Sequence, residues 1–337
     1  ERPPLDVAAL ERYCASVVPG LRGPLQVAQI VGGSSNPTFI LAAQDGHRYV
    51  LRKKPPGTLL PSAHQVEREF RVMQALQGSG VPVPRMLGLC EDASLVGTPF
   101  YVMEYVEGRI FRDAQLPGCT PAERAAIYDA LNETLARLPQ VDYRAVGLED
   151  FGKPGNYFQR QFSRWERQYR GAQTDAIPEM EALVTRLASL LPQDDATATI
   201  VHGDFRTENT MFHPTAPRVA AVLDWELCTI GHPLADLAHL CVQYHTTATA
   251  FGTLAGIDHA ALGIPTQAEF VAAYCRRTGR DGIPDFGFYL GFAMFRLASI
   301  AQGSEKRRRD GVNPRPKPPG ADCVDWARHA LRALESL

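Results

Sequence analysis

The stretch "VHGDFRTENTMFHP", Val201 to Pro214, brings a His, an Asp and an Asn together inside a short apolar frame. Within it an Asp at 204 and an Asn at 209 stand five positions apart. This spacing alone is a weak signal, because it occurs by chance in many chains. Its meaning comes from "VAAVLDWELCTIGHPLADLAHL", where an apolar run of strand character ends at Asp224. Carboxylate and amide oxygens are the ligands that Mg²⁺ prefers, so the three residues together predict a magnesium site.

The five-residue interval is the one at which a kinase catalytic loop carries its base and its metal-binding amide. Phosphoryl transfer from ATP needs a carboxylate near the attacking hydroxyl and oxygen ligands for Mg²⁺. We therefore expect Asp204 to orient the acceptor hydroxyl and accept its proton. Asn209 and Asp224 are the expected metal ligands.

The composition limits the classes of partner. With 337 residues, 45% of them hydrophobic and 21% charged, the chain has the composition of a globular protein with a core in one or two lobes. Its net charge of -2 provides no overall field that attracts nucleic acid or an anionic membrane. We expect neither partner, and the oligomeric state is left open.

Seven cysteines are scattered along the chain without a C-x-x-C pair. Their odd number and spacing argue against a disulfide framework and a zinc site, and favour a reducing compartment. The most apolar late segment, "FGFYLGFAMF", is too short to cross a bilayer. The expected location is cytoplasmic, in a bacterial cytosol, with mitochondrial and peroxisomal locations open. Because the first residue is not Met, a removed leader stays open.

Short β-rich runs dominate before residue 105. The predicted strands are "LQVAQIV" (25–31), "TFILAAQ" (38–44), "RYVLRK" (48–53), "RMLGLC" (85–90) and "FYVMEYV" (100–106), with a helix in 62–80. Asp45-Gly46 between the second and third runs predicts a hairpin. After residue 120 the periodicity is mostly helical. This order predicts an α+β, protein-kinase-like bilobal fold, with a small β-rich lobe in 1–105 and a larger, mostly helical lobe in 106–337.

Through "HGDFRTEN" and "LDWELCTIGHPLADLA" the chain resembles the aminoglycoside-phosphotransferase-like superfamily of small-molecule kinases. Within it, "YVLRKKPPGTLLPSAHQVEREFRV" and "FRLASIAQG" are most similar to the kinase-like domain fused to acyl-CoA dehydrogenases. The resemblance runs from about Gln26 to Gly303. It implies a hydroxyacyl-CoA, specifically a 4-hydroxyacyl-CoA, as the acceptor.

The first lobe offers residues for holding ATP. "IVGGSSNPTF" places Gly33, Ser34 and Ser35 between two strands, where backbone N–H groups and hydroxyls suit phosphates, although the loop is not G-x-G-x-x-G and a plain turn is the alternative. Arg52 stands where the kinase strand lysine would be and can pair with Glu69.

Two further ATP contacts follow from the end of the first lobe. Met103 to Val106 resembles the kinase hinge, so the backbone at Glu104 and Val106 is expected to bind adenine. Lys53, on the opposite strand face from Arg52, is an alternative phosphate ligand.

Two absences indicate a small-molecule acceptor. Only twelve residues separate Asp224 from Asp236, too few for the activation segment on which a protein kinase seats a peptide. Gly203 stands where the H-R-D motif of the protein-kinase catalytic loop has its Arg. In many protein kinases that Arg pairs with a phosphorylated activation loop, so control by such phosphorylation is not expected here. For His202 and Asp236 we expect structural roles that tie the catalytic loop to the following helix.

Charge is the only guide to the acceptor's identity. An acyl-CoA carries phosphates and needs cations, whereas aminoglycosides are polycations and need acids. The candidate phosphate-binding residues are Arg160 and Arg164 in "YFQRQFSRWERQYR" and Arg307, Arg308 and Arg309 in "EKRRRDGVNPRPKP". Aromatic stripes are usually core and arginine runs are usually solvated, so both patches also have structural interpretations. A kinase of another hydroxylated metabolite or of an aminoglycoside, and a non-catalytic nucleotide or acyl-CoA sensor, are the alternatives.

Overall fold

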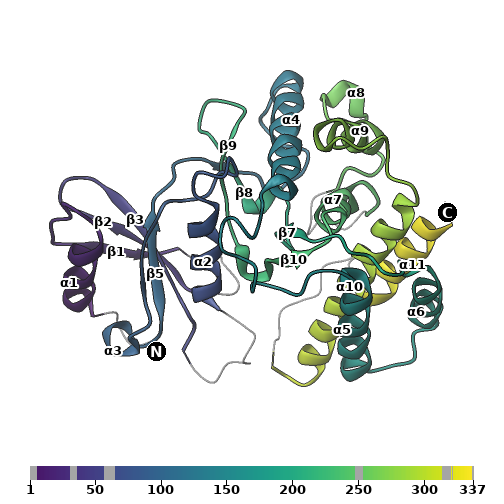
Figure 1. Ribbon diagram of the computed structural model, residues 1–337, viewed down its shortest axis with the longest axis horizontal. Coiled ribbons are helices and arrows are strands. Elements are labelled where there is room, and N and C mark those ends of the chain that lie inside the picture. Colours follow the sequence, from purple (N-terminus) through teal and green to yellow (C-terminus); the bar gives the residue numbers. More distant parts are fainter. Residues whose placement is uncertain are drawn as a thin grey trace. The chain divides into compact units, whose positions relative to one another are not determined.

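The computed structural model describes residues 6–30, 36–56, 65–246, 253–312, 320 and 322–335 (Figure 1). The chain folds into two compact units. Unit 1 comprises Glu1–Gly108 and Ala220–Cys228, and unit 2 comprises Arg109–Val219 and Thr229–Leu337. In the described part of the chain, no helix has both the length and the apolar character needed to cross a membrane.

Unit 1 is built on a five-stranded antiparallel sheet with strand order β1-β2-β3-β5-β4. The strands are β1 (Gln26–Gln29), β2 (Thr38–Ala42), β3 (Arg48–Lys53), β4 (Met86–Cys90) and β5 (Phe100–Glu104). Each lies within the run predicted from β-rich sequence. The predicted hairpin is confirmed, because β2 and β3 pair antiparallel around Gly46, whose φ is 86°. Glycine adopts such a left-handed conformation without steric cost.

Three helices belong to unit 1: α1 (Val7–Val17), α2 (Val66–Leu76) and α3 (Ala93–Val96). The predicted helix in 62–80 is confirmed by α2, whereas α1 and α3 were not predicted. α1 buries Leu10 and Cys14 in the core formed with the sheet. It approaches β4 so closely that a Cβ at Gly88 would overlap Val17 and the Tyr13 hydroxyl.

Residues 220–228 return to unit 1 late in the chain. They contain most of β9 (Val219–Val222) and the short 3-10 helix η3 (Trp225–Leu227), which packs against α2. The Val222 amide donates a hydrogen bond to the Pro82 carbonyl at 2.8 Å. Trp225 is 1% exposed, and this burial ties the segment that bears Asp224 to unit 1. The predicted division at residue 105 did not anticipate this return.

Unit 2 is mostly helical. Its helices are α4 (Pro121–Arg137), η1 (Leu138–Gln140), α5 (Tyr157–Ala172), α6 (Pro178–Leu190), η2 (Thr207–Asn209), α7 (Leu234–Cys241), η4 (Val242–Tyr244), α8 (His259–Leu262), α9 (Gln267–Thr278), α10 (Phe286–Arg309) and α11 (Cys323–Leu334). The short strands are β6 (Arg109–Ile110), β7 (Thr199–Val201), β8 (Thr210–Phe212) and β10 (Thr229–Gly231). β6 pairs with β8 and β10 with β7, both antiparallel.

The core of unit 2 forms where α10 packs against α5, α6, α7 and α11. The aromatic stripe of α5 (Phe158, Phe162, Trp165 and Tyr169) is buried in it, as the structural interpretation of that stripe expected.

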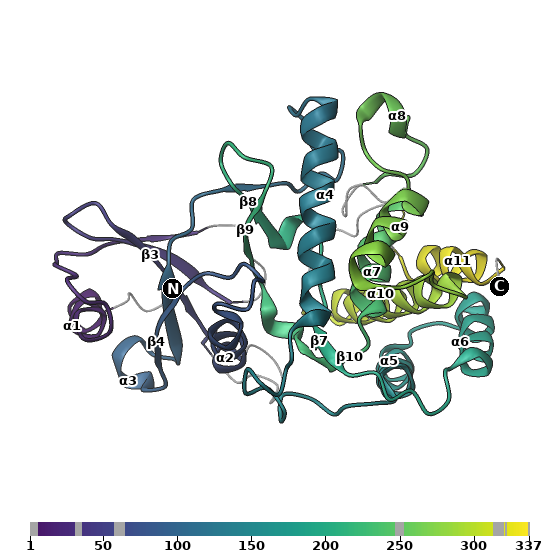
Figure 2. The same ribbon diagram turned by 45° about the horizontal axis from the view of Figure 1, so that its top comes forward.

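On another side of unit 2, α4 lies beside α8 and α9 (Figure 2). Three helices of unit 2 begin with a capping box: α4 at Thr120, α9 at Thr266 and α11 at Asp322. In each box the side chain of the capping residue accepts a hydrogen bond from a backbone amide that has no partner within the helix.

The close approach of β10 to α5 at Gly231 is a testable packing constraint. A Cβ at Gly231 would overlap the ring of Tyr157, which is itself buried. We expect Gly231→Ala to lower the free energy of unfolding by about 1–3 kcal/mol, the usual range for overpacking. Urea denaturation of the purified chain measures this change.

Gly171, near the end of α5, is the matched control because a Cβ there would meet no atom within 4 Å. Gly171→Ala should leave stability unchanged or raise it by up to about 1 kcal/mol, since alanine favours helix. Equal stability of both variants would show that β10 tolerates a side chain at position 231.

Candidate active site

The loop after β7 carries the first group of candidate residues. β7 pairs with β10, and the chain then turns at Gly203, whose φ is 85°. A larger residue would be strained in this left-handed conformation. The turn explains in physical terms why glycine stands where protein kinases have arginine. η2 follows and ends at Asn209.

Asp204 and Asn209 are in direct contact. Asn209 Nδ2 lies 2.9 Å from the backbone oxygen of Asp204 and 2.9 Å from its Oδ2, and it donates to both. Because the amide nitrogen is the donor, the amide oxygen Oδ1 of Asn209 is left for another partner. The five-residue interval in the sequence therefore brings a carboxylate and an amide oxygen side by side.

His239, on α7, is a site residue that the sequence did not single out. Its Nε2 lies 2.9 Å from Asp204 Oδ1. Burial lowers the pKa of His239, although Asp204 acts to raise it, so the neutral ring donates through Nε2–H. Its Nδ1 is buried and has no hydrogen-bond partner in the described part of the chain.

The surroundings of Asp204 favour the carboxylate form. Burial opposes ionisation, but His239 and the charges of Arg206 and Arg296 together bring the pKa of Asp204 well below its usual range. Arg206 Nε lies 3.6 Å from Asp204 Oδ1. An ionised carboxylate can accept a hydrogen bond from a hydroxyl group. It takes the proton only as that hydroxyl becomes acidic during bond formation.

Asp236 holds this loop against α7. Its carboxylate accepts hydrogen bonds from the amides of His202 (2.7 Å) and Gly203 (2.8 Å), and the residue is 2% exposed. The His202 ring is fully buried, and its Nδ1 accepts from the Asp204 amide at 3.1 Å. The structural roles expected for Asp236 and His202 are confirmed.

Asp224 lies in unit 1, at the end of β9. Its φ of 64° places a non-glycine residue in the left-handed region, a conformation that Asp tolerates better than most residues. Arg52 Nη2 donates to Asp224 Oδ1 at 2.8 Å. Arg52 Nε lies 3.3 Å from Glu69 Oε2, so the expected pairing of Arg52 with Glu69 is present.

Glu69 is fully buried on α2 and surrounded by donors. Asn36 Nδ2 donates to its Oε1 at 3.0 Å, and the Tyr101 hydroxyl donates to its Oε2 at 2.9 Å. Burial raises the pKa of Glu69 to about 7, against the opposing charge of Arg52. Arg52 therefore favours the charged form of Glu69, since a guanidinium does not lose its proton.

The oxygen atoms of unit 1 that could hold a cation lie around Asp224. One carboxylate oxygen from each of Glu69, Asp224 and Glu226 falls within 4.8 Å of the others. Both oxygens of Glu69 already accept hydrogen bonds, which leaves Asp224 and Glu226 as the better candidates. Hard carboxylate oxygens fit Mg²⁺. Glu226 was not predicted as part of the site.

The remaining predicted ATP contacts stay predictions. Gly33, Ser34 and Ser35 lie outside the described residues. Glu104 ends β5, and its Oε1 accepts from the Arg85 amide at 2.8 Å, so its side chain is used within the sheet edge. The Val106 amide makes no hydrogen bond to any described residue.

Comparison with known proteins identifies the family. Residues 26–289 match the model of the phosphotransferase enzyme family. The chain belongs to this family. It is 48% identical over 307 residues to mouse acyl-CoA dehydrogenase family member 10, and 47% identical over 318 residues to rat member 11. These matches cover 90% and 91% of this chain but 28% and 40% of the relatives' own lengths.

One solved structure is similar enough in sequence to place the chain in the same family. A Ralstonia eutropha protein assigned to the aminoglycoside phosphotransferases is 47% identical, with a TM-score of 0.90 and 99% of both chains covered. An aminoglycoside phosphotransferase crystallised with AMP-PNP and hygromycin B is 15% identical, with a TM-score of 0.63 and 97% and 98% covered. The latter shows likeness of fold. The predicted kinase-like fold class and the resemblance to this phosphotransferase family are both confirmed, and the chain is a phosphotransferase by family.

The predicted acceptor-binding arginines differ in their freedom to bind a ligand. Arg308 pairs with Glu305 at 2.7 Å, and Arg309 pairs with Asp175 at 2.7 Å. Arg307 Nη2 donates to Ser304 Oγ at 3.1 Å. Local partners thus satisfy this run in part, as its solvated interpretation expected.

The two predicted arginines of α5 also have local contacts. Arg160 donates to the Lys153 carbonyl. The guanidinium of Arg164 lies 5.2 Å from the centre of the Trp165 ring.

Arg296, in the middle of α10, is a second residue that the sequence did not single out. Its guanidinium lies 5.5 Å from the Trp165 ring centre, and its buried Nε has no hydrogen-bond partner in the described ranges. The charges of Arg160, Arg164 and Arg296 all act on the Tyr157 hydroxyl, whose pKa burial raises to about 12. Arg296 also acts on Asp204. Of these three arginines, Arg296 is therefore the one whose charge reaches the candidate base.

Proposed function

We propose that the chain is an ATP- and Mg²⁺-dependent kinase that transfers the γ-phosphoryl group to a hydroxyl group of a small molecule. The observation that carries the proposal is the Asp204–Asn209 pair, in which an ionised carboxylate and an amide oxygen lie side by side. Phosphoryl transfer needs this combination of a proton acceptor and a hard oxygen ligand. Membership of the phosphotransferase enzyme family supports it.

In this mechanism Asp204 accepts a hydrogen bond from the acceptor hydroxyl and orients its oxygen toward the γ-phosphorus. A new oxygen–phosphorus bond forms while the bond from the γ-phosphorus to the bridging oxygen of ATP breaks, and ADP leaves. The hydroxyl proton passes to Asp204. His239 holds the carboxylate from the other side through Nε2–H, so it acts as a positioning residue.

Asn209 and Asp224 are the proposed Mg²⁺ ligands. Asn209 would use Oδ1, because its Nδ2 already donates to Asp204. Asp224 would use a carboxylate oxygen, and ligation of Oδ1 requires release of the hydrogen bond from Arg52. When bound, Mg²⁺ supplies positive charge that stabilises the phosphate oxygens.

ATP binding is assigned to unit 1. Arg52, held by Glu69, would reach a phosphate through its fork of donors. The backbone of Glu104 and Val106 would bind adenine. In this proposal Gly33, Ser34 and Ser35 would cover the phosphates.

For the acceptor we propose a hydroxyacyl-CoA, with a 4-hydroxyacyl-CoA as the specific form. The charges that act on Asp204 include Arg206 and Arg296 and suit an anionic acceptor. An aminoglycoside is a polycation and would meet repulsion there. The names of the relatives, which are acyl-CoA dehydrogenase family members, agree with an acyl-CoA. Arg160, Arg164 and Arg307 to Arg309 are the further proposed contacts with the acceptor's phosphates.

An acceptor screen tests the whole proposal. Hydroxyacyl-CoAs, sugars and aminoglycosides are each mixed with ATP and Mg²⁺, and acceptor-dependent ADP release is measured. Release with a hydroxyacyl-CoA supports the proposal. Robust phosphorylation of kanamycin would move the assignment to an aminoglycoside kinase, and nucleotide binding without ADP release for any acceptor would indicate a non-catalytic sensor.

Asp204→Asn tests the base. The change removes the proton acceptor with little change in shape, so turnover should fall by about 10²-fold or more, roughly 2.7 kcal/mol of barrier, while ATP binding stays nearly intact. Steady-state kinetics and calorimetry measure the two effects. Asp281→Asn, at an exposed residue, is the control and should keep full turnover. Turnover of Asp204→Asn within a factor of a few of wild type would remove Asp204 from the mechanism.

Asp224→Ala tests the metal site. Loss of a carboxylate ligand should weaken Mg²⁺-dependent nucleotide binding and abolish measurable transfer. Titration of nucleotide at several Mg²⁺ concentrations measures the first effect. Asp45→Ala, an exposed acid in the β2–β3 hairpin, should bind nucleotide as wild type does. Full activity of Asp224→Ala at every Mg²⁺ concentration would show that this carboxylate is not a ligand.

Arg296→Met tests the cationic acceptor site. Arg296 Nε has no hydrogen-bond partner among the described residues, so its guanidinium should bind an acceptor phosphate or carbonyl. Its loss should raise the KM for a hydroxyacyl-CoA about 10-fold and leave the KM for ATP unchanged. A variant with Arg307, Arg308 and Arg309 all changed to Gln should have a smaller effect, because two of these residues already have acidic partners. A larger effect of the triple change would assign the acceptor's phosphates to the end of α10 instead.

A further inference from the structure

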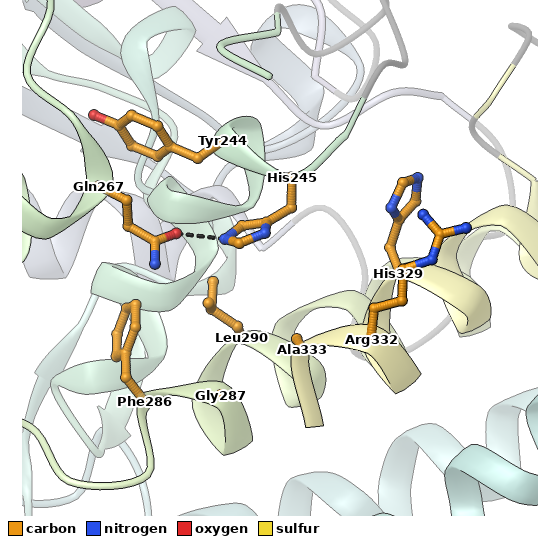
Figure 3. Close-up of a pocket in the computed structure, with 9 residues that line it drawn as sticks. All are labelled: Tyr244, His245, Gln267, Phe286, Gly287, Leu290, His329, Arg332 and Ala333. Carbon is orange, nitrogen blue, oxygen red and sulfur yellow. Dashed lines mark hydrogen bonds between the residues drawn. The ribbon is translucent and has the colours of Figure 1, made fainter. Parts of the chain in front are cut away.

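A cavity of about 560 Å³ lies in unit 2, and none of its lining residues is among those assigned to phosphoryl transfer. It forms where η4, the starts of α9 and α10 and the end of α11 meet, and Figure 3 shows its lining side chains. The volume is in the range of pockets that bind small organic molecules. None of its lining residues has a role in the mechanism above.

One wall of the pocket carries oriented hydrogen-bonding groups. His245 Nε2 lies 2.5 Å from Gln267 Oε1, so the ring donates to the amide oxygen (Figure 3). Because Oε1 of Gln267 is used in this way, its NH₂ group is left to donate elsewhere. The second ring nitrogen of His245 becomes another donor when the ring is protonated.

The opposite wall carries the cation of Arg332 and the ring of His329. Arg332 makes no ion pair and no hydrogen bond through its side chain with any described residue, and the His329 ring makes no hydrogen bond there. One turn earlier on α11, Arg328 is instead bound to Glu179 at 2.7 Å. No Asp or Glu is among the residues that line the pocket. An anion in the pocket would therefore meet a guanidinium and two imidazoles, and no carboxylate of the lining would compete with it.

The floor of the pocket is apolar. Phe286 and Leu290, on successive turns of α10, line it, and Leu290 is 3% exposed. Contact with these side chains would remove the apolar surface of a ligand from water, which is favourable. Inorganic phosphate has no such surface, so this floor adds nothing to its binding.

We propose that this pocket binds an organic carboxylate, with the carboxylate against Arg332 and the imidazoles and an apolar body against Phe286 and Leu290. The guanidinium of Arg332 can donate two parallel hydrogen bonds to a carboxylate. Gln267 supplies a further neutral donor. The site needs neither ATP nor the phosphoryl acceptor, so it stands whether or not the proposed kinase activity does.

Binding should strengthen as the pH falls. Burial lowers the pKa of His329, the charges of Arg332 and His245 lower it further, and Asp325 on the same helix raises it. A bound carboxylate would offset the repulsion between Arg332 and a protonated His329 ring, and so favour protonation of that ring. Because the pKa of His329 lies below its usual value of about 6.5, the ring gains its charge mainly below that pH, where an alkyl carboxylate is still largely ionised, so the affinity for the ligand should rise as the pH falls below about 6.5.

Calorimetric titration of the full chain with 4-phenylbutanoate tests the proposal, with its neutral amide and inorganic phosphate as parallel probes. We expect saturable binding of the carboxylate and much weaker binding of the other two. Arg332→Gln should weaken binding by about 10-fold or more, because a charge-assisted hydrogen bond is lost. Arg332 is exposed, so this change should not disturb folding.

Arg328→Gln, on the same helix, is the matched control and should bind 4-phenylbutanoate as wild type does. His329→Gln should reduce the dependence of affinity on pH. The proposal is overturned if wild type shows no saturation below about 10 mM, if the amide or phosphate binds as tightly as the carboxylate, or if Arg332→Gln binds as tightly as wild type.

Discussion

The geometry around Asp204 depends on one buried carboxylate. Asp236 accepts hydrogen bonds from two successive amides, those of His202 and Gly203, and so fixes the loop against α7. The same helix carries His239, which donates to Asp204. α7 therefore holds both the backbone and the functional group of the loop. A buried charge is costly unless it is hydrogen-bonded. The two amide donors offset part of that cost, although burial still raises the pKa of Asp236 above its usual value.

The sequence predicted the parts of the fold and site that have local signals. The β2–β3 hairpin follows from Asp45-Gly46, and the contact between Asp204 and Asn209 follows from a five-residue interval. His239 and Arg296 lie 35 and 92 positions after Asp204, and no local pattern links residues so far apart. Their proximity to the catalytic loop comes from the packing of α7 and α10, which periodicity does not reveal.

The same cations near Asp204 have two physical effects. Together with His239, Arg206 and Arg296 keep the carboxylate ionised, which prepares it to accept a hydrogen bond from a hydroxyl. Under the proposed function, the same cations would also favour an anionic acceptor over a cationic one. Charge that keeps Asp204 ionised would then contribute to the choice of acceptor as well. Specificity of this kind comes from repulsion as well as attraction.

The presence of arginine at position 52 has a consequence for chemical modification. Kinases usually place a lysine on this strand, and an amine in such a position can be acetylated or attacked by acylating reagents. The guanidinium of Arg52 stays protonated and is held between Glu69 and Asp224, so it is a poor nucleophile. Acylation cannot silence this position, and reagents that label kinases through the strand amine should leave Arg52 unlabelled.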